Sequence, residues 1–468
     1  MTYPPNVRTA PPSAPRHAPA GPPVEPDAAQ PPARRAAWWE TTDRLRAAAT
    51  TEPGRLRIIG AALALLVVAF GAVTAWEISD RHSAAGDVVS RSQPLSADAA
   101  NIYRSLADAD TAAASGFLAG AQEPEKVQER YREDIATASG LLITAATHTD
   151  GDSESGRQIK TLNEGLPRYT GLVERARANN RQGLPLGGAY LRYANEQMTK
   201  ELLPAAEKLY AAETDRLARD NDAARLWPFV SLALGVVALG VLVWAQRRNY
   251  RRTNRVFNHG LLAATAGAAV LLLWLAVGQT VARAELDNAQ KQGQESLKVL
   301  NEARINSLKA RANENLTLVA RGAVLTADGK NDKYETDYAT GMDKLSTALG
   351  EARKLADNSA GGRPVDEAIS AVAQWRDRHK SVSETDRSGD YGTAVEKVIG
   401  DGGSTGQSFD RVDRALGEAV AQEQKEFKAS ASDGRGALTG LAIGAGVLAL
   451  VAALGAILGV GRRLSEYR

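Results

Sequence analysis

The 468-residue chain contains no cysteine, which excludes disulfide bonds and thiolate metal sites. Its five histidines are His17, His82, His148, His259 and His379. They are scattered, and none forms the i, i+4 pair that a helical metal site would use. A phosphate-binding glycine-rich loop and a nucleophile elbow are missing as well. We therefore predict that the protein is not an enzyme and that it holds no metal and no cofactor.

Charged residues are absent from the centres of four apolar windows in an otherwise well-charged chain, at residues 57–78, 226–246, 256–281 and 436–460. A helix needs about 20 apolar residues to cross about 30 Å of hydrocarbon, and each window is long enough. The windows lack the broken helices and midplane charges of a transporter. The first is too long for a signal peptide, and no cleavage site follows it. The sequence therefore predicts four retained transmembrane helices.

The segment between the second and third spans, residues 247–255, carries five arginines and no acidic residue. The positive-inside rule places this segment in the cytoplasm, together with both chain ends, residues 1–54 and 461–468. We predict a multi-pass plasma-membrane protein that contacts the lipid bilayer. An anionic-lipid or nucleic-acid site is a second interpretation of the arginines, but topology alone explains them, so we expect no nucleic-acid partner. These residues, which also form a possible cytoplasmic contact surface, are Arg247, Arg248, Arg251, Arg252 and Arg255.

The N-terminal tail, residues 1–54, is rich in proline, including the pairs at 4–5, 11–12, 22–23 and 31–32. Such a segment buries too little apolar surface to fold, so we predict a disordered tether.

Two regions of similar length remain between the spans, residues 79–225 and 282–435, and they resemble each other. Collinear pairs include Ser105 with Ser307, Asp134 with Asp337, and Tyr169 with Trp375. We infer an ancient duplication of a span-bundle-span unit. His379 falls on an apolar helical stripe where the first region has Val173, and we interpret it as a packed histidine and not as a ligand or pH sensor. Tyr131, Leu142 and their partners also follow helical spacing.

Turn residues divide each region into four helices. The breaks are expected at residues 122–124, 150–152 and 183–185, and at 328–329, 361–364, 388–390 and 400–403. Strand-like alternation is absent. The predicted fold is an all-α membrane protein with four transmembrane helices and two duplicated extracytoplasmic four-helix bundles.

Two stretches have helical patterns that continue from the outer regions into the spans. Residues 186–245 are interrupted only by Pro204 and Pro228, and residues 256–327 only by scattered glycines. We expect these outer helices to run straight into the membrane. This continuity favours either transmission of a displacement or an economical attachment of the bundles.

The four-span layout, with residues 175–191 (RARANNRQGLPLGGAYL) and 310–316 (ARANENL), resembles the GlnX-type tetra-spanning membrane proteins of actinobacteria. The resemblance covers most of the chain from about residue 55. It implies a receptor-like role between an extracytoplasmic glutamate- and aspartate-binding lipoprotein and a soluble serine/threonine kinase. No functional residue is carried over, because no family motif matches residue by residue.

Our hypothesis is a non-enzymatic signal relay that passes amino-acid availability from a solute-binding lipoprotein to a cytoplasmic serine/threonine kinase. The alternatives are a scaffold or adhesion protein of the cell envelope and a direct small-molecule sensor of the chemoreceptor type. A homodimer would suit the architecture. The acidic segment at 150–154 lacks the spacing of a calcium loop and predicts a capped turn. Its side chains Asp150, Asp152 and Glu154 are expected at the outer docking tips.

Overall fold

The computed structural model describes residues 52–253, 258–356, 358–400 and 402–464. Contacts group residues 59–468 into one compact unit, and the packing described below lies within that unit. Helices make up nearly all of the described residues, whose isolated β-bridge joins Leu325 and Asp332. The predicted all-α fold is therefore confirmed. The predicted tether at 1–54 lies almost wholly outside the described residues.

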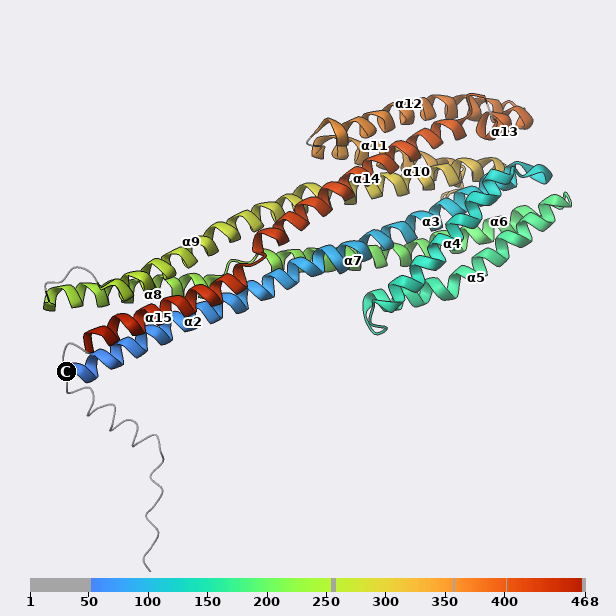
Figure 1. Ribbon diagram of the computed structural model, residues 1–468. Helices are drawn as coiled ribbons and strands as arrows, with labels where there is room; N and C mark the ends of the chain where they lie inside the picture. The colour runs from blue at the N-terminus through green and yellow to red at the C-terminus, as the bar shows by residue number, and fades with distance from the viewer. Residues whose placement is uncertain (1–51, 254–257, 357, 401, 465–468) are drawn as a thin grey trace, which may run out of the picture. The chain divides into compact units, whose positions relative to one another are not determined.

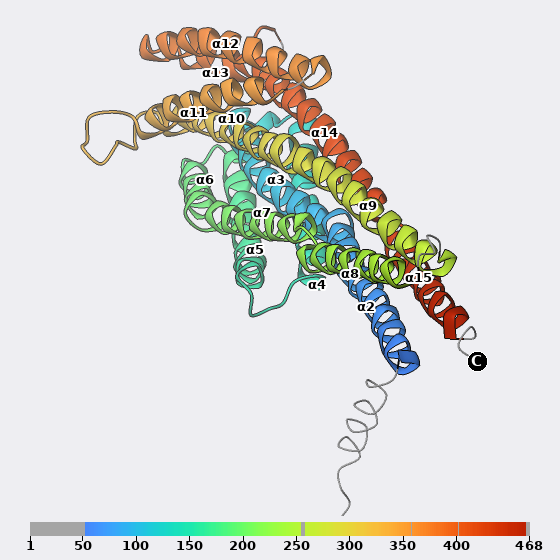
Figure 2. The same ribbon diagram turned by 90° about the vertical axis from the view of Figure 1, so that its left-hand side faces the viewer.

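Four described helices are long and apolar enough to cross a membrane, as predicted. Their apolar parts are α2 (Glu52–Asp87), α8 (Phe229–Thr253), α9 (His259–Asn288) and α15 (Leu441–Leu464). Figures 1 and 2 show these four helices gathered at one end of the unit, here called the membrane end. Apolar side chains on their outer faces, such as Leu65 (73 % exposed) and Ile443 (76 % exposed), lie where lipid would cover them.

Small residues bring α9 and α15 into backbone contact at the membrane end. A Cβ atom at Gly260 would lie 2.5 Å from the Cα atom of Gly459 and would overlap the carbonyl oxygen of Gly455. On the other face of α15, Ala449 leaves no room for a Cβ atom at Gly71 of α2. Without a hydrophobic driving force in lipid, such close van der Waals packing is what holds membrane helices together.

Two membrane helices continue without interruption into the remaining helices, here called the helical domain. Helix α2 passes through a π-helical turn, Val88–Ser92, into α3 (Gln93–Leu118). Helix α9 passes through a second π-helical turn, Ala289–Gln294, into α10 (Glu295–Ala320). The continuity expected for residues 256–327 is confirmed from His259 to Ala320.

The continuity expected for residues 186–245 is wrong at one place. Helix α6 (Leu186–Gln197) runs through a π-helical turn, Met198–Leu202, into α7 (Leu203–Arg225), so Pro204 is accommodated at the start of α7. The helix then stops at Leu226, because Pro228 has no backbone N–H and disfavours helical conformation in the residue before it. Similarly, α14 (Thr405–Leu438) is separated from α15 at Gly440, whose φ is +80°.

Polar side chains of neighbouring helices hold the break between α7 and α8. Arg81 of α2 donates to the carbonyl oxygens of Leu226 (2.7 Å) and Trp227 (3.1 Å). Gln279 of α9 also donates to the Leu226 oxygen (3.0 Å). Glu77 of α2 accepts from the backbone N–H of Ser231 in the first turn of α8 (3.0 Å). The backbone groups that the break frees are thus satisfied within the protein, as a membrane environment requires.

The helical domain has two halves, here called the first and second repeats after the duplication inferred from the sequence. The first repeat contains α3, α4 (Glu125–Thr147), α5 (Glu154–Arg181), α6 and α7, with a short 3₁₀ turn at Gly120–Gln122. The second contains α10, α11 (Lys333–Leu355), α12 (Ser359–Arg387), α13 (Tyr391–Ile399) and α14. The break expected at 361–364 lies earlier, because the side chain of Asn358 accepts from the N–H groups of Ala360 and Gly361 and so starts α12 at Ser359.

One hydrophobic core joins the two repeats. Its buried side chains come from both repeats and form a single cluster that extends from Ala99 to Leu209 and from Leu300 to Val420. Helices α3 and α10 pack against each other at its centre. The repeats therefore share a core and do not stand as separate bundles.

We expect the Gly260→Ala variant to unfold at lower temperature than the wild type in detergent or nanodiscs. The added methyl group overlaps the backbone of α15, and such overpacking costs about 1–3 kcal/mol. Gly446→Ala is the matched control, because a Cβ atom there meets nothing within 4 Å. Equal thermal stability of the two variants would contradict close packing of α9 on α15.

Candidate functional site

The contact between α3 and α10 is the place where the two repeats, and the two continuous helices, meet. Alanines along α3, including Ala109, Ala112 and Ala113, are buried and allow the helices to approach closely. Thr111 donates to the carbonyl oxygen of Leu308 (3.0 Å). One helical turn further on, the amide of Asn315 donates to Ser115 (2.7 Å). Polar contacts therefore fix the register of α3 on α10.

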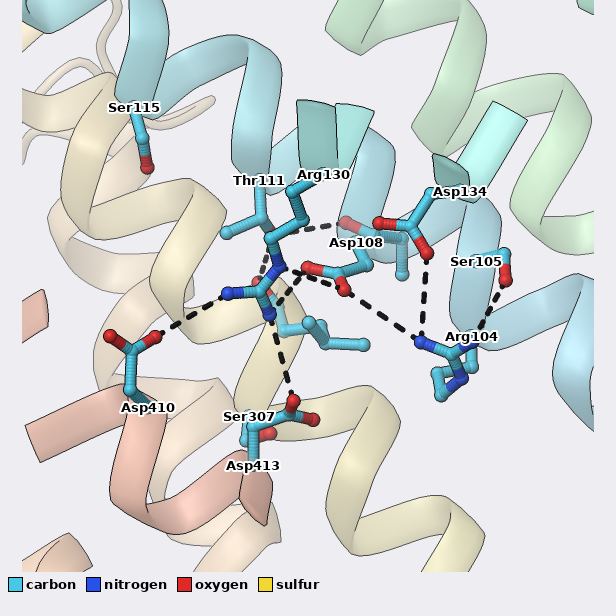
Figure 3. Close-up of polar contacts among 12 residues, drawn as sticks. Arg104, Ser105, Asp108, Thr111, Ser115, Arg130, Asp134, Ser307, Asp410 and Asp413 are labelled. Atoms are coloured by element: carbon cyan, nitrogen blue, oxygen red, sulfur yellow. Dashed lines mark hydrogen bonds and ion pairs between the residues drawn. The ribbon is translucent and has the colours of Figure 1, made fainter. Parts of the chain in front are cut away.

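A network of charged side chains lies beside this contact (Figure 3). Arg130 of α4 binds Asp108 of α3 through two nitrogens, at 2.9 and 3.1 Å. The same guanidinium reaches Asp410 (3.4 Å) and Asp413 (3.6 Å) on α14 of the second repeat. It also lies over the ring of Phe409, 5.4 Å from its centre. Arg130 thus links the two repeats through charge.

Two further arginines complete the network. Arg304 of α10 binds Asp413 at 2.9 Å. Burial would raise the pKa of Asp413, but Arg304 and Arg130 outweigh burial and hold the pKa below its usual value. Arg104 of α3 lies 3.7 Å from Asp108 and 3.6 Å from Asp134 of α4.

Asp134 has the opposite electrostatic environment. It is buried, and burial together with the neighbouring charge of Asp108 raises its pKa to about 8, despite the nearby Arg104. Its carboxyl group is therefore largely protonated at neutral pH. The network combines a lowered and a raised carboxyl pKa on opposite sides of the inter-repeat contact.

Each repeat also buries one carboxylate that accepts from an aromatic side chain. In the first repeat, Tyr169 of α5 donates to Asp110 (3.2 Å), which also accepts from Asn195 (2.7 Å). In the second, Trp375 of α12 donates to Glu314 (3.1 Å). Tyr169 and Trp375 were paired by sequence, and their equivalent contacts agree with the inferred duplication.

His379 is buried, in line with its interpretation as a packed histidine, but it is also held by two carboxylates. It contacts Glu314 at 2.9 Å and Glu335 at 3.2 Å, and its ring stacks on Tyr338 at 3.7 Å. Burial alone would lower the pKa of His379, but the hydrogen bonds with the two glutamates raise it to about 9. Arg311 adds a second cation to Glu314, at 2.5 Å.

A cavity of about 320 Å³ lies between the repeats, on another side of α3 and α10. Its walls come from α3, α6, α7, α10 and α11, so a molecule within it would touch both repeats. Asp110 and Asn195, the buried pair described above, line it together with Tyr103. The cavity and the charge network together form the candidate functional site, here called the inter-repeat site.

The predicted basic surface lies at the opposite end of the chain's helices. Arg247, Arg248 and Arg251 belong to the last turns of α8, where Arg248 lies over the ring of Trp244 at 5.3 Å. The side chain of Arg252, and the whole of Arg255, lie outside the described residues.

The predicted docking tips are misplaced. Asp150, Asp152 and Glu154 are exposed, and Ser153 caps α5 by accepting from the N–H of Gly156, as the capped turn required. However, α4 runs back along α3 toward the membrane end: Arg130 faces Asp108, and Asp134, one turn later, faces Arg104.

The loop that follows α4 therefore lies beside the first turns of α3. His148, at the start of this loop, is close enough to Asp98 of α3 to counteract part of the rise in pKa that burial causes there. The far ends of the first repeat are instead the turns near residues 119–124 and 182–185.

Sequence reasoning missed the inter-repeat site. Asp108, Arg130 and Asp413 are separated by up to about 300 residues, and each alone looks like a solvated charge on an amphipathic helix. The helical stripe that contains Tyr131 and Asp134 was the available signal, because a carboxylate within an apolar stripe needs a partner.

Residues 84–222, which cover most of the first repeat, match a family model described as an actinobacterial sensor domain. No curated protein and no solved structure matches the chain. Among the described residues, no group of three or more histidine, aspartate or glutamate side chains is arranged to hold a metal ion. The match indicates a sensing or signalling role for a chain with four helices apolar enough to cross a membrane.

We expect Arg130→Met to destabilise the helical domain by on the order of 2 kcal/mol, because it removes the nearest cation from the buried Asp108 and one of two cations from the half-buried Asp413. Arg353→Met is the control, since Arg353 and Asp366 form an exposed pair at 2.7 Å that contributes less than about 1 kcal/mol. Chemical denaturation monitored by circular dichroism measures both. A loss for Arg130→Met no larger than for Arg353→Met would show that the network is not buried.

The raised pKa of Asp134 predicts a pH dependence of stability. Its folded-state pKa of about 8 exceeds the unfolded value of about 3.9, so its stabilising contribution is full below pH 4 and is lost as pH rises through 8. Asp134→Asn removes this dependence and should gain on the order of 2 kcal/mol over the wild type between pH 5.5 and 8.5. The exposed Asp377→Asn is the control. A constant difference between Asp134→Asn and wild type across this range would refute the assignment.

Proposed function

We propose that the protein is a transmembrane sensor in which a signal at the helical domain changes the packing of α3 on α10 and so moves the membrane helices α2 and α9. One observation carries the proposal. The two helices that meet at the inter-repeat site are the two that continue unbroken toward the membrane end, from Glu52 to Leu118 and from His259 to Ala320. A relative shift of α3 and α10 therefore has a direct mechanical route to α2 and α9.

The other two connections differ in a way that supports this role. The chain breaks at residues 226–228 between α7 and α8, and at Thr439 and Gly440 between α14 and α15. A break lets α8 and α15 change their angle to α7 and α14 when the continuous helices shift. Two continuous and two interrupted connections allow a relative displacement of helix pairs.

The charge network supports two distinct arrangements. Arg130 is held by three carboxylates on two helices, and its pair with the buried Asp108 demands accurate geometry because an unpaired buried charge is costly. A shift of α14 past α3 would break these ion pairs together and form another set, with no stable intermediate positions. A signal then needs only a differential affinity for the two arrangements.

We also propose that the protein has one partner on each side of the membrane. The resemblance to GlnX-type proteins supports an extracytoplasmic solute-binding lipoprotein that reports glutamate or aspartate, and a cytoplasmic serine/threonine kinase that receives the signal. The positive-inside rule supports an orientation in which Arg247, Arg248 and Arg251 face that kinase. We place the lipoprotein at the turns near residues 119–124 and 182–185, which lie farthest along the first repeat. Acidic Asp150, Asp152 and Glu154 remain a second docking surface to test.

A scaffold protein of the cell envelope is the competing function, because helical bundles also serve as docking surfaces. A scaffold needs the helical domain to be folded but does not need its charge network to influence the other side of the membrane.

Crosslinking and affinity purification of the full chain from its native cells, with mass spectrometry, separates these functions. The relay predicts recovery of a solute-binding lipoprotein and of a kinase, with kinase recovery changed at least threefold by Arg130→Met and unchanged by Arg353→Met. Both substitutions lie in the helical domain. A change in the recovered amount of a cytoplasmic kinase therefore shows that the helical domain is coupled to the cytoplasmic face. Recovery of cell-wall or division proteins, unaffected by Arg130→Met, would replace the relay with a scaffold.

A further inference from the structure

The cavity between the repeats is polar although it borders the hydrophobic core. Its α10 wall includes the polar residues Asn306, Lys309 and Asn313, at positions i, i+3 and i+7 and hence on one helix face. Its α11 wall contains Asp337, Gly341 and Lys344, at positions i, i+4 and i+7 and hence also on one helix face. Cavities of about 300 Å³ and more are typical of small-molecule sites. The second repeat thus presents two polar helix faces to one small cavity.

The charges in this cavity are not fully paired. Lys333 binds Asp337 at 2.5 Å, and the buried Asp110 accepts from Tyr169 and Asn195. In the described part of the chain, neither Lys309 nor Lys344 has a carboxylate within ion-pair distance. Lys309 instead donates to the Tyr103 hydroxyl at 2.9 Å.

Lys309 and Lys344 line the same cavity, from α10 and α11. Burial lowers the pKa of Lys309, and the charge of Lys344 lowers it further, while Glu207 partly offsets the effect. Glu207 is exposed on α7, at the rim of the cavity. Two ammonium groups that line one cavity, with the side-chain amides of Asn306 and Asn313 on the same wall as Lys309, form an arrangement that an anion would stabilise.

We propose that the cavity binds a small organic anion whose carboxylate or phosphate group lies between the ammonium groups of Lys309 and Lys344. This inference rests on the proposed sensor function and deepens it, because the anion would be a signal that the helical domain detects directly. The ligand would touch α3 and α7 of the first repeat and α10 and α11 of the second, and would therefore favour one arrangement of the repeats.

A lipid headgroup does not fit as the source of the anion. Lys309 lies about 20 residues beyond Asn288, where the apolar helix α9 ends, and a helix rises 1.5 Å per residue. The cavity is thus roughly 30 Å along the helix from the membrane end. A soluble metabolite reaches this position, whereas a bilayer headgroup does not.

The test uses the full chain in nanodiscs of neutral lipid, with succinate, citrate and inorganic phosphate as probes. Thermal unfolding and calorimetry are recorded against chloride at matched ionic strength, and against neutral succinamide. We expect a saturable rise in unfolding temperature with at least one of the three anions and none with succinamide. Lys309→Met and Lys344→Met should each weaken that binding tenfold or more.

Lys333→Met is the matched control. It removes a lysine of the same cavity whose charge is already neutralised by Asp337, so binding should stay within about threefold of wild type. Lys344 is exposed, so its variant keeps the test valid if Lys309→Met fails to fold. The inference is overturned if none of the three anions binds saturably, or if Lys333→Met weakens binding as much as Lys344→Met. Loss of anion binding in Asp110→Asn with no loss in the lysine variants would place the anion away from Lys309 and Lys344 and would also overturn it.

Anion binding in the cavity and the signal relay can fail independently of each other. If an anion binds through Lys309 and Lys344 but kinase recovery does not respond to Arg130→Met, the site stands and the relay fails. If no anion binds while kinase recovery still responds to Arg130→Met, the relay stands without a directly bound signal.

Discussion

The packing of α3 against α10 brings the first helices of both repeats to the centre of one shared core. Each is the unbroken continuation of a membrane helix, so this contact fixes α2 and α9 relative to each other. Thr111 and Asn315 set the register of the contact, and Arg130 ties its flank to α14. The cavity, the charge network and the route to the membrane end all follow from this one helix pair.

Burying charges beside such a contact is a poor way to gain stability but an effective way to specify geometry. A hydrophobic replacement of Arg130 and its carboxylates would often be at least as stable, whereas loss of one partner alone is costly. The ion pairs of Arg130 and Arg304 with Asp413 resist intermediate positions, as a two-state device needs.

Much of the fold was predictable because lipid and helix geometry act on consecutive residues. A run of about 20 apolar residues identifies a span, and the 3.6-residue period identifies the helices that include Tyr131 and Tyr169. The break at Pro228 shows the limit of such prediction. A proline at a helix end cannot be told by sequence from a proline in a continuing helix, such as Pro204, because the difference depends on side chains from other helices. Arg81 and Gln279 stabilise the first case, and both come from other helices.

The inter-repeat site could not be predicted in the same way, because its pairings join distant segments. Arg130 and Asp410 lie 280 residues apart, and no local period records their contact. The error in the position of Asp150 has a simpler cause. The sequence identified the turn correctly, but the distance of this turn from the membrane end depends on α4 returning along α3. The antiparallel pairing of Asp134 with Arg104 establishes that direction.

The most direct test of the central claim measures coupling between the inter-repeat site and the far ends of α2 and α9. The chain has no cysteine, so spin labels at Ala61→Cys and His259→Cys, both exposed, would be unique. Pulsed electron paramagnetic resonance in nanodiscs then gives the distance between the two helix ends, with Arg130 intact or replaced by Met. We expect Arg130→Met to shift or broaden this distance distribution, and Arg353→Met to leave it unchanged. Identical distributions in folded wild type and Arg130→Met would contradict it.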